Sequence, residues 1–125
     1  MDISAPASAL SAFALSQQVA AHNLANVNTE ELRASRATLE DRPDQGGVAV
    51  QEVRQTSAEP PQVPSVRLEE RQGRVEQAAA YAPGSTTDAA REMVNLAANQ
   101  RAYEANAAVI RARDEMVGAV LDIRA

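Results

Sequence analysis

The chain has 125 residues, a net charge of −5 and three aromatic residues, Phe13, Tyr81 and Tyr103. This length fits one domain with a modest core, and the scarcity of rings favours narrow helix seams over a thick globular core. With no cysteine and one histidine, His22, the chain has no thiolate nucleophile and no second imidazole for a zinc site or a catalytic triad. We therefore expect no enzyme, no catalytic or metal-binding residues and no cofactor.

Charge and hydropathy exclude two further classes of protein. All the basic residues are arginines scattered along the chain, whereas nucleic-acid-binding proteins usually gather positive charge on one face. No apolar run reaches the roughly 18 residues of a membrane span. The apolar run at residues 9–15 has no basic residue before it, so it does not predict a cleavable signal peptide. We expect neither nucleic-acid binding nor membrane insertion.

The first 29 residues predict a helical arm. Ser4 and Pro6 suit a first turn, and the helix is expected from about residue 5 to 27. Its larger side chains recur in alternating steps of three and four residues, which places them on one seam. The seam residues are Leu10, Phe13, Gln17, Ala20, Leu24 and Val27.

Residues 30–84 form an irregular middle, rich in proline, glycine and charge. Residues 46–53 predict one strand. Several prolines between residues 60 and 64 exclude a central strand and favour an extended polyproline linker. A short hairpin is expected around residues 69–72.

The segment from residue 85 to the end predicts one long helix. Ser85 followed by Asp88 resembles a capping box, and the helix would span on the order of 50 Å at 1.5 Å per residue. A helix of this length with a coiled-coil seam needs a partner helix. Gln17 and Gln100, one in each seam, either pair across the interface or stay partly exposed. The seam residues here are Met93, Leu96, Gln100, Tyr103, Ala107, Ile110, Asp114, Val117 and Leu121.

A second apolar stripe, made mostly of smaller side chains, runs along the same helix. Two stripes on one helix indicate one of two arrangements. Either one stripe covers the N-terminal arm while the other meets a neighbouring molecule, or both are buried in a single helical bundle. Spacing alone favours neither. The second stripe consists of Val94, Ala98, Ala105, Val109, Ala112, Met116, Val120 and Ile123.

The string RAYEAN, residues 101–106, places a tyrosine between two charges. On a helix, Arg101 and Glu104 are three residues apart and suit a surface ion pair, while Tyr103 points into the seam. These groups do not converge, so we interpret the string as a packing surface rather than a catalytic site. The ring of Tyr103 is expected to pack on Leu24 or Phe13.

The N-terminal arm ends in Asn-Leu-Ala-Asn-Val-Asn-Thr, residues 23–29. Asparagines are common at helix ends, so a plain helix terminus explains part of this string. Taken with the strings at residues 92–96, 100–106 and 114–116, it resembles the paired terminal signatures of the bacterial flagellar rod and hook family. The motif residues that carry the resemblance are Asn23, Ala25, Asn26, Asn28, Thr29, Arg101, Tyr103, Glu104 and Asn106.

This resemblance covers roughly residues 7–41 and 85–123, and it implies a function that composition does not. Proteins of that family are exported unfolded through the flagellar type III export apparatus, without a cleavable signal peptide, and assemble in the periplasm as part of the basal body. Their two terminal helices pack as a coiled coil in the wall of a helical tube. The short length of this chain resembles the proximal rod proteins, which implies that its partners are copies of itself or other rod proteins.

One departure from the family pattern lies directly after Thr29. Relatives usually continue with Pro-Gly and an aromatic residue, whereas this chain has Glu30-Glu31-Leu32. Thr29 followed by two acids is a good start for a helix, so residues 30–40 are a candidate helix. Because of this departure, two interpretations stay open: a standard rod subunit, or a divergent relative with a different lattice contact.

These observations predict a mainly α protein. Two long terminal helices, within residues 1–29 and 85–125, pair as an antiparallel, coiled-coil-like hairpin around a small irregular β-containing middle, residues 30–84. The implied function is that of a structural subunit of the flagellar basal-body rod, which polymerises through its terminal helices. The alternative is a non-polymerising helical adaptor or chaperone-like module that binds rod or export components. An adaptor is expected to be a stable hairpin alone, whereas a rod subunit orders on assembly.

Overall fold

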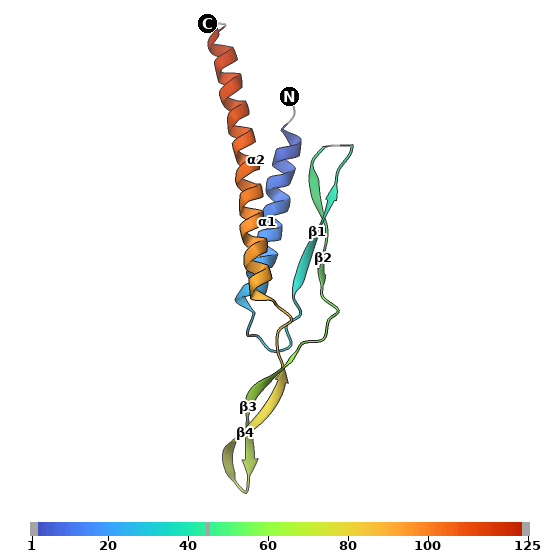
Figure 1. Cartoon of the computed structure of the whole chain (residues 1–125), viewed down its shortest axis with the longest axis vertical. Coiled ribbons are helices and arrows are strands. Elements are labelled where there is room, and N and C mark those ends of the chain that lie inside the picture. The colour runs from blue at the N-terminus through green and yellow to red at the C-terminus, as the bar shows by residue number, and fades with distance from the viewer. Residues whose placement is uncertain (1–2, 45, 124–125) are drawn as a thin grey trace.

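The computed structural model describes residues 3–44 and 46–123, which form two helices and four strands (Figure 1). The strands make two separate antiparallel hairpins, β1–β2 and β3–β4. No helix within the described ranges combines the length and the apolar character that a membrane span requires. In chain order, the elements are α1 (Ser4–Ala25), β1 (Ser35–Asp41), β2 (Val48–Gln55), β3 (Gln62–Arg71), β4 (Arg74–Pro83) and α2 (Ala89–Ile123).

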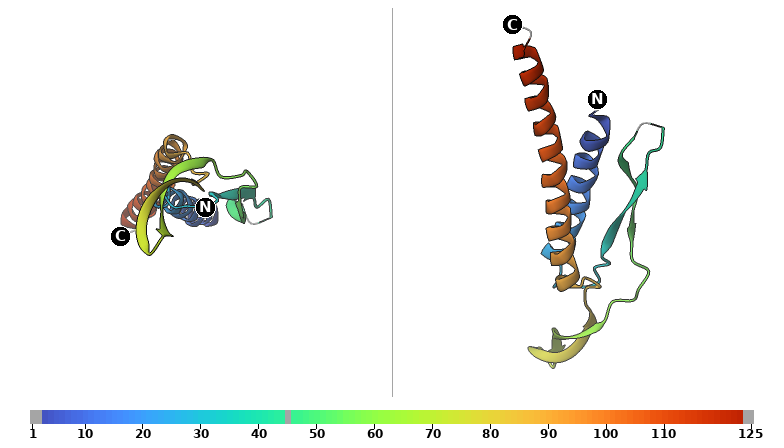
Figure 2. Two further views of the ribbon diagram at one scale, coloured as in Figure 1. Left: turned by 90° about the horizontal axis from the view of Figure 1, so that it is seen from below. Right: turned by 45° about the horizontal axis from the view of Figure 1, so that its top comes forward.

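The two helices lie antiparallel and side by side, with both chain termini toward the same end of an elongated molecule (Figures 1 and 2). α1 has 22 residues and α2 has 35, so at 1.5 Å per residue α2 extends roughly 20 Å past α1. Asp88 caps the start of α2, because its Oδ1 accepts a 3.1 Å hydrogen bond from the backbone N–H of Arg91. The C-terminal segment of α2 therefore has no α1 beside it.

The β1–β2 hairpin lies along α1 and contacts it with both strands (Figure 2). Its strands pair from Ser35 opposite Gln55 to Asp41 opposite Val48. The register shifts between residues 38 and 39, which marks a β-bulge or a similar irregularity. The hairpin thus forms a second layer beside the helical pair.

The far end of this hairpin is held against the first turns of α1. Gly47 has a φ of +97°, and a Cβ at this position would lie 2.8 Å from Ala5 Cα. The backbone N–H of Val48 donates a 3.2 Å hydrogen bond to Ser8 Oγ. Only glycine fits such a close approach with a positive φ, so this residue lets the two layers meet.

The β3–β4 ribbon projects away from the helices at the opposite end of the molecule (Figure 1). Its strands pair from Gln62 opposite Pro83 to a turn at Gln72 and Gly73, whose φ angles of 52° and 75° are typical of a type I′ turn. Pro64 is tolerated within β3 because both strands of a two-stranded ribbon are edge strands. In the described part of the chain, the ribbon contacts no other helix or strand.

Residues 30–34 and 84–88 lead between the helices and the hairpins, and residues 56–61 join the two hairpins; together with the end of β4 at Pro83, we call this region the waist. Backbone groups of these segments are paired with one another rather than left to solvent. The hydroxyl of Thr86 adds a further link by accepting a 2.8 Å hydrogen bond from the Ala34 N–H. The backbone bonds run from Glu31 N–H to Pro83 O (2.9 Å), from Gly84 N–H to Pro61 O (2.7 Å) and from Thr86 N–H to Leu32 O (3.0 Å).

The core is small. Among the described residues, the buried apolar side chains are all alanines, and two polar side chains, Asn23 and Glu92, are buried with them. Methyl groups allow the elements to approach closely, but they remove little apolar area from water, so hydrophobic stabilisation is modest. The buried alanines are Ala9, Ala12, Ala20 and Ala82.

The expected fold class is wrong for the middle of the chain. Strands of 7, 8, 10 and 10 residues form two hairpins there, so the β content is substantial rather than a small irregular part. The short hairpin expected around residues 69–72 is part of a ribbon with ten residues in each strand. Both faces of that ribbon carry polar residues and meet solvent, so the alternation of apolar and polar residues that predicts a strand is weak.

The candidate helix at residues 30–40 is also wrong, because these residues form a turn followed by β1. Glu31 has a φ of 60°, which is incompatible with a right-handed helix, and its N–H donates to Pro83 O. The N–H of Ser35 donates a 2.8 Å hydrogen bond to Asn23 Oδ1, which places the start of β1 beside the end of α1. Partners from distant parts of the chain thus override local helix propensity.

Candidate assembly interface

Most of the predicted seam of α1 lies directly beside the buried face of that helix, whereas its member Ala20 is itself buried. The buried residues Ala9, Ala12 and Asn23 each precede a seam residue by one position. One residue of an α-helix corresponds to a rotation of roughly 100°, so α1 turns its small side chains, rather than its large ones, into the packed layer. The seam residues Leu10, Phe13, Gln17, Leu24 and Val27 are half-buried.

The predicted seam of α2 is divided between packed and open residues. Leu96 and Ile110 are half-buried. Asn23 contacts Glu92, so in an antiparallel pair the start of α1 lies level with about residue 111 of α2. The exposed residues of this seam are Met93, Gln100, Tyr103, Asp114, Val117 and Leu121. The role of both seams in assembly stays a prediction.

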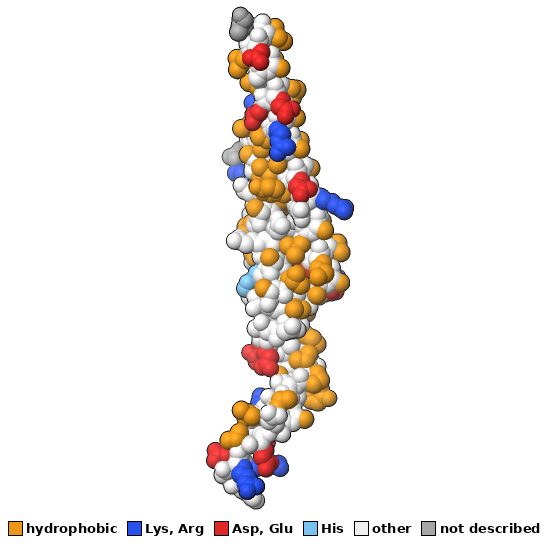
Figure 3. Space-filling model, turned by 90° about the vertical axis from the view of Figure 1, so that its left-hand side faces the viewer, with side chains coloured by type: hydrophobic (Ala, Val, Ile, Leu, Met, Phe, Trp, Pro, Cys, Tyr) orange, Lys and Arg blue, Asp and Glu red, His pale blue; other side chains and the backbone are white. Residues whose placement is uncertain are grey.

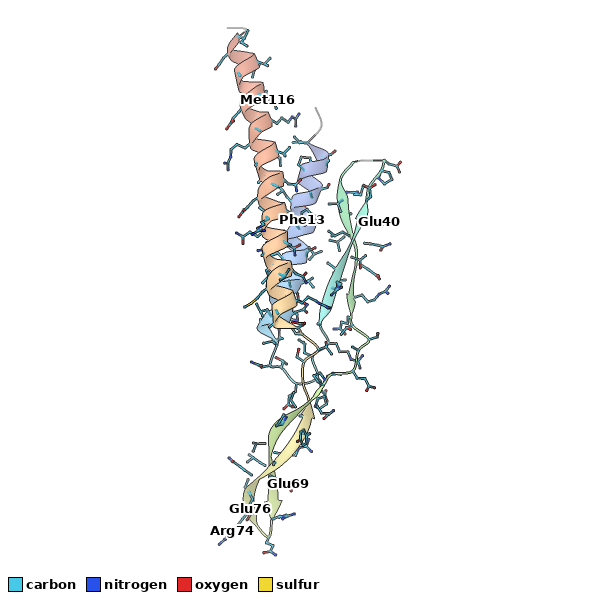
Figure 4. The ribbon with its side chains drawn as sticks, viewed as in Figure 1. Phe13, Glu40, Glu69, Arg74, Glu76 and Met116 are labelled. Carbon is cyan, nitrogen blue, oxygen red and sulfur yellow. The ribbon has the colours of Figure 1, made fainter. Side chains whose placement is uncertain are left out.

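The second stripe of α2 is exposed along its whole length. Figure 3 shows hydrophobic side chains along the free upper helix, and Figure 4 shows Met116 on the part of α2 past α1, well above Phe13. The described residues place no element over this stripe, so the chain does not fold into the single bundle considered above. The exposed members are Val94, Ala98, Ala105, Val109, Ala112, Met116, Val120 and Ile123.

The first motif residue, Asn23, connects three elements through one amide group. It is only 1% exposed. Its Nδ2 donates to Ser35 O at 2.7 Å and to Glu92 Oε1 at 3.1 Å, and its Oδ1 accepts from the Ser35 N–H at 2.8 Å. Glu92, 7% exposed, also accepts from Asn95 Nδ2 at 3.3 Å. We call this set of four residues the Asn23 clasp.

The remaining residues of the N-terminal motif close the end of α1. Asn26 Nδ2 donates to His22 O at 2.9 Å, and Asn26 Oδ1 accepts from the Thr29 hydroxyl at 3.1 Å. Ala25 and Asn28 are exposed. These contacts are local, as expected for asparagines at a helix terminus. The motif thus combines one buried connecting residue with a local helix end.

The C-terminal motif lies on an open part of α2. Gln100 Nε2 donates to Glu104 Oε1 at 2.9 Å, so Glu104 pairs with a residue one turn earlier, and Arg101 is exposed. Asn106 Nδ2 donates to Ala102 O at 2.8 Å. These contacts stay within the helix and leave the motif surface available to a neighbour.

Tyr103 faces α1 but is 40% exposed. It borders an open groove of about 580 Å³ together with Ala14, Gln17 and Ala21 of α1. Phe13 and Leu24, the expected partners of the ring, do not line this groove. Tyr103 therefore sits at the rim of the helical pair, where a ring with a polar hydroxyl tolerates water at one end.

Sequence reasoning missed the partners of Asn23. Glu92 entered only as the first residue of the string at residues 92–96, and Ser35 carried no signal at all. The available signal was the pair Glu92 and Asn95, whose three-residue spacing places a carboxylate and an amide on one helix face. The position of Gly47 against Ala5 was likewise invisible, because the two residues meet only in the folded chain.

The chemistry of this region is that of packing and hydrogen bonding. Another groove, about 460 Å³, lies between α1, β1 and α2 and is lined by residues such as Ser16, Ala37 and Asn99. Within residues 3–44 and 46–123, no three histidine or acidic side chains are grouped closely enough to hold a metal ion. The open grooves and the exposed stripe of α2 suit contact with another macromolecule.

Comparison with known proteins points to one family. Residues 71–123 match the family model described as flagellar basal body rod FlgEFG protein C-terminal. The matched segment begins at the tip of the β3–β4 ribbon and continues through β4 and all of α2. No curated protein matches the chain.

Proposed function

We propose that this chain, a relative of the flagellar rod and hook proteins, is a structural subunit of the bacterial flagellar basal-body rod that polymerises through its terminal helices. The family match at residues 71–123 supports a basal-body rod-related role. Polymerisation, and its mediation by the terminal helices, go beyond this match and form our proposal.

One observation carries this proposal: many large apolar side chains of the molecule are exposed, and none of those in the described residues is fully buried. The buried apolar residues of the described chain are alanines, while the second stripe of α2 is open over its full length. Each Å² of apolar surface removed from water stabilises by roughly 25 cal/mol, so such a stripe favours association. Neighbouring subunits would supply the core that one copy lacks.

The proposal extends to partners and location. The partners are further copies of this chain or other rod proteins, and the assembled chain lies in the periplasmic part of the basal body. The chain would reach it unfolded, through the flagellar type III export apparatus and without a cleavable signal peptide. A core of a few alanines supports this route, because a marginally stable chain unfolds readily. The short middle suits a proximal position in the rod.

A second candidate function is that of a helical adaptor that binds rod or export components without joining the tube. The Asn23 clasp favours it, because these hydrogen bonds close the helical hairpin within a single copy. An adaptor of this kind would leave the second stripe for one partner and would not form long polymers.

Sedimentation velocity and electron microscopy of the purified chain over a range of concentrations test the first function. We expect the wild-type chain to associate into elongated polymers. Val109→Asp places a charge in the exposed stripe, and desolvating that charge should raise the concentration needed for association by at least tenfold, or about 1.4 kcal/mol. Ala108→Asp, on an exposed residue outside both stripes, is the matched control and should associate as wild type does.

Two results would count against the rod subunit. If the wild-type chain stays monomeric at every concentration, alone and mixed with other rod proteins, polymerisation is excluded. If Val109→Asp and Ala108→Asp associate equally well, the second stripe of α2 is not the interface.

A further inference from the structure

The β3–β4 ribbon has one apolar face that nothing in the described chain covers. Residues directly opposite each other in the ribbon share a face, and the pairs Pro64–Tyr81, Val66–Ala79 and Glu70–Val75 lie on the same side. Leu68 lies between them on that side, opposite the polar Gln77. The exposed fractions of Val66, Leu68, Val75 and Tyr81 lie between 65% and 72%.

A ribbon with such a face is stabilised when another surface packs against it. Two isolated strands are marginally stable in water, and this ribbon contacts no other helix or strand of the described residues. The four large side chains leave on the order of 400 Å² of apolar surface open, which is in the range of patches that mark interaction sites. The opposite face is interrupted by charge, with Glu69 opposite Glu76 and Arg71 opposite Arg74.

The free segment of α2 is the complementary surface. From Val109 to Ile123 the second stripe runs over about 20 Å, at 1.5 Å per residue. On the ribbon, the apolar face from Pro64 to Glu70 runs over about the same length, at roughly 3.3 Å per residue. Both surfaces are apolar, exposed and equally long, and they lie at opposite ends of the elongated molecule (Figures 1 and 3).

We propose that the apolar face of the β3–β4 ribbon of one copy docks onto the Val109–Ile123 stripe of α2 of a second copy, in a head-to-tail contact along the axis of the assembly. This inference rests on the proposed polymerisation and names the contact that propagates it. Two unlike patches on one chain make a heterologous interface, which extends into a line of subunits instead of closing into a dimer.

The direction of the two elements fixes the register of this contact. The ribbon points away from the waist in one direction and α2 points away in the other (Figure 1). In a head-to-tail pair the ribbon tip therefore lies near Val109 and the ribbon base near Ile123. Glu70, the charged residue on the apolar face, then lies near Arg113, which flanks the stripe. A surface pair of this kind orients the contact and adds little affinity.

The area of the proposed contact is small. The two patches together bury on the order of 800 Å², less than the 1,200–2,000 Å² or so of stable interfaces. One such contact is weak, and it holds only when the seams of neighbouring subunits contribute as well. The associated fraction should therefore rise steeply with protein concentration.

Disulfide trapping tests the register, since the chain has no cysteine of its own. A Leu68→Cys chain is mixed with a Met116→Cys chain at concentrations at which the wild-type chain associates, and the mixture is oxidised mildly. We expect a disulfide-linked heterodimer at least tenfold more abundant than from Arg67→Cys with Met116→Cys, because position 67 lies on the opposite face of the ribbon. All three positions are exposed, so the variants keep the fold.

Each other outcome contradicts the contact in a different way. Association without preferential linkage of positions 68 and 116 rejects this docking and leaves the proposed polymerisation standing. Preferential linkage of two Leu68→Cys chains to each other means that the ribbons pair face to face. If none of the chains associates, the wild-type chain included, both polymerisation and this contact are rejected.

Discussion

At Asn23, a single amide connects the end of α1 with the beginnings of β1 and α2. The side chain is buried and makes hydrogen bonds to Ser35 and Glu92. Buried polar groups are stabilising only while their partners are present, because an unpaired group retains its full desolvation cost. Asn23 therefore contributes more to the stability of this small core than the size of its side chain indicates.

Replacing Asn23 with alanine should destabilise the chain markedly. The substitution removes all of these bonds and leaves the Glu92 carboxylate buried with one amide partner, so we expect a loss of about 2–4 kcal/mol in the free energy of unfolding. Chemical unfolding followed by circular dichroism measures it. Asn26→Ala, which removes only local contacts at the end of α1, should cost about 1 kcal/mol or less. Equal losses for the two variants would contradict the role given to Asn23.

Among the elements, the β3–β4 ribbon carries an arrangement of charge that weakens its tip. Glu69 lies opposite Glu76, and Arg71 lies opposite Arg74, so two consecutive cross-strand pairs on one face have like charges. Figure 4 shows Glu69, Arg74 and Glu76 gathered toward the far end of the ribbon. Such charge disfavours pairing of the open strand edges with other chains, at some cost in stability.

Exchanging the two charges on β4 should stabilise the ribbon. The double variant Arg74→Glu/Glu76→Arg keeps the composition and the net charge but makes both pairs opposite in sign. We expect a gain of roughly 0.2–1 kcal/mol per pair, seen as slower amide hydrogen exchange in β3 and β4. The gain should shrink in about 1 M salt, where the Debye length is near 3 Å. A gain that is unchanged by salt would show that charge is not its cause.

The helices and the strands differ in how far their sequences predict them. α2 was predictable because its signals are local: Asp88 caps it, and apolar residues recur at helical spacing. Three of the four strands were missed or shortened, since the ribbon has solvent on both sides and β1 begins where Asn23 binds Ser35. Solvent on both faces of the ribbon and a contact with a distant residue cannot be inferred from the local sequence.

The same distinction applies to the candidate interface. The second stripe of α2 follows from spacing alone, because helical periodicity determines which residues share a face. That the stripe is uncovered depends on where α1 and the hairpins lie. The link from Asn23 to Glu92 joins residues 69 positions apart, and neither residue identifies the other in the sequence.

The whole molecule is long and thin, and its stability is unevenly distributed. The clasp and the waist concentrate the hydrogen bonds between elements, whereas α2 past about residue 111 has no neighbouring helix. Helical segments shorter than about 12–15 residues are marginal in water when nothing packs on them. The ends of the isolated molecule should therefore open far more often than its middle.

Hydrogen exchange on a dilute, proven monomer tests this distribution. We expect amides of α2 beyond residue 111 to exchange nearly as fast as an unfolded chain, and those around Asn23 and Glu92 to be the most protected. On assembly, protection should spread to the end of α2. Strong protection up to Ile123 in the monomer would favour the adaptor over the rod subunit.

The order of the hydrogen-bonded pairs along the chain has a consequence for how the molecule folds. Each β-hairpin joins neighbouring segments, so both need only short loops to close and form in microseconds. The contact of α1 with α2 must close a loop of more than half the chain, including both hairpins, before Asn23 reaches Glu92. The hairpins should thus form first, and a chain threaded N-terminus first cannot complete the clasp until Glu92 has emerged.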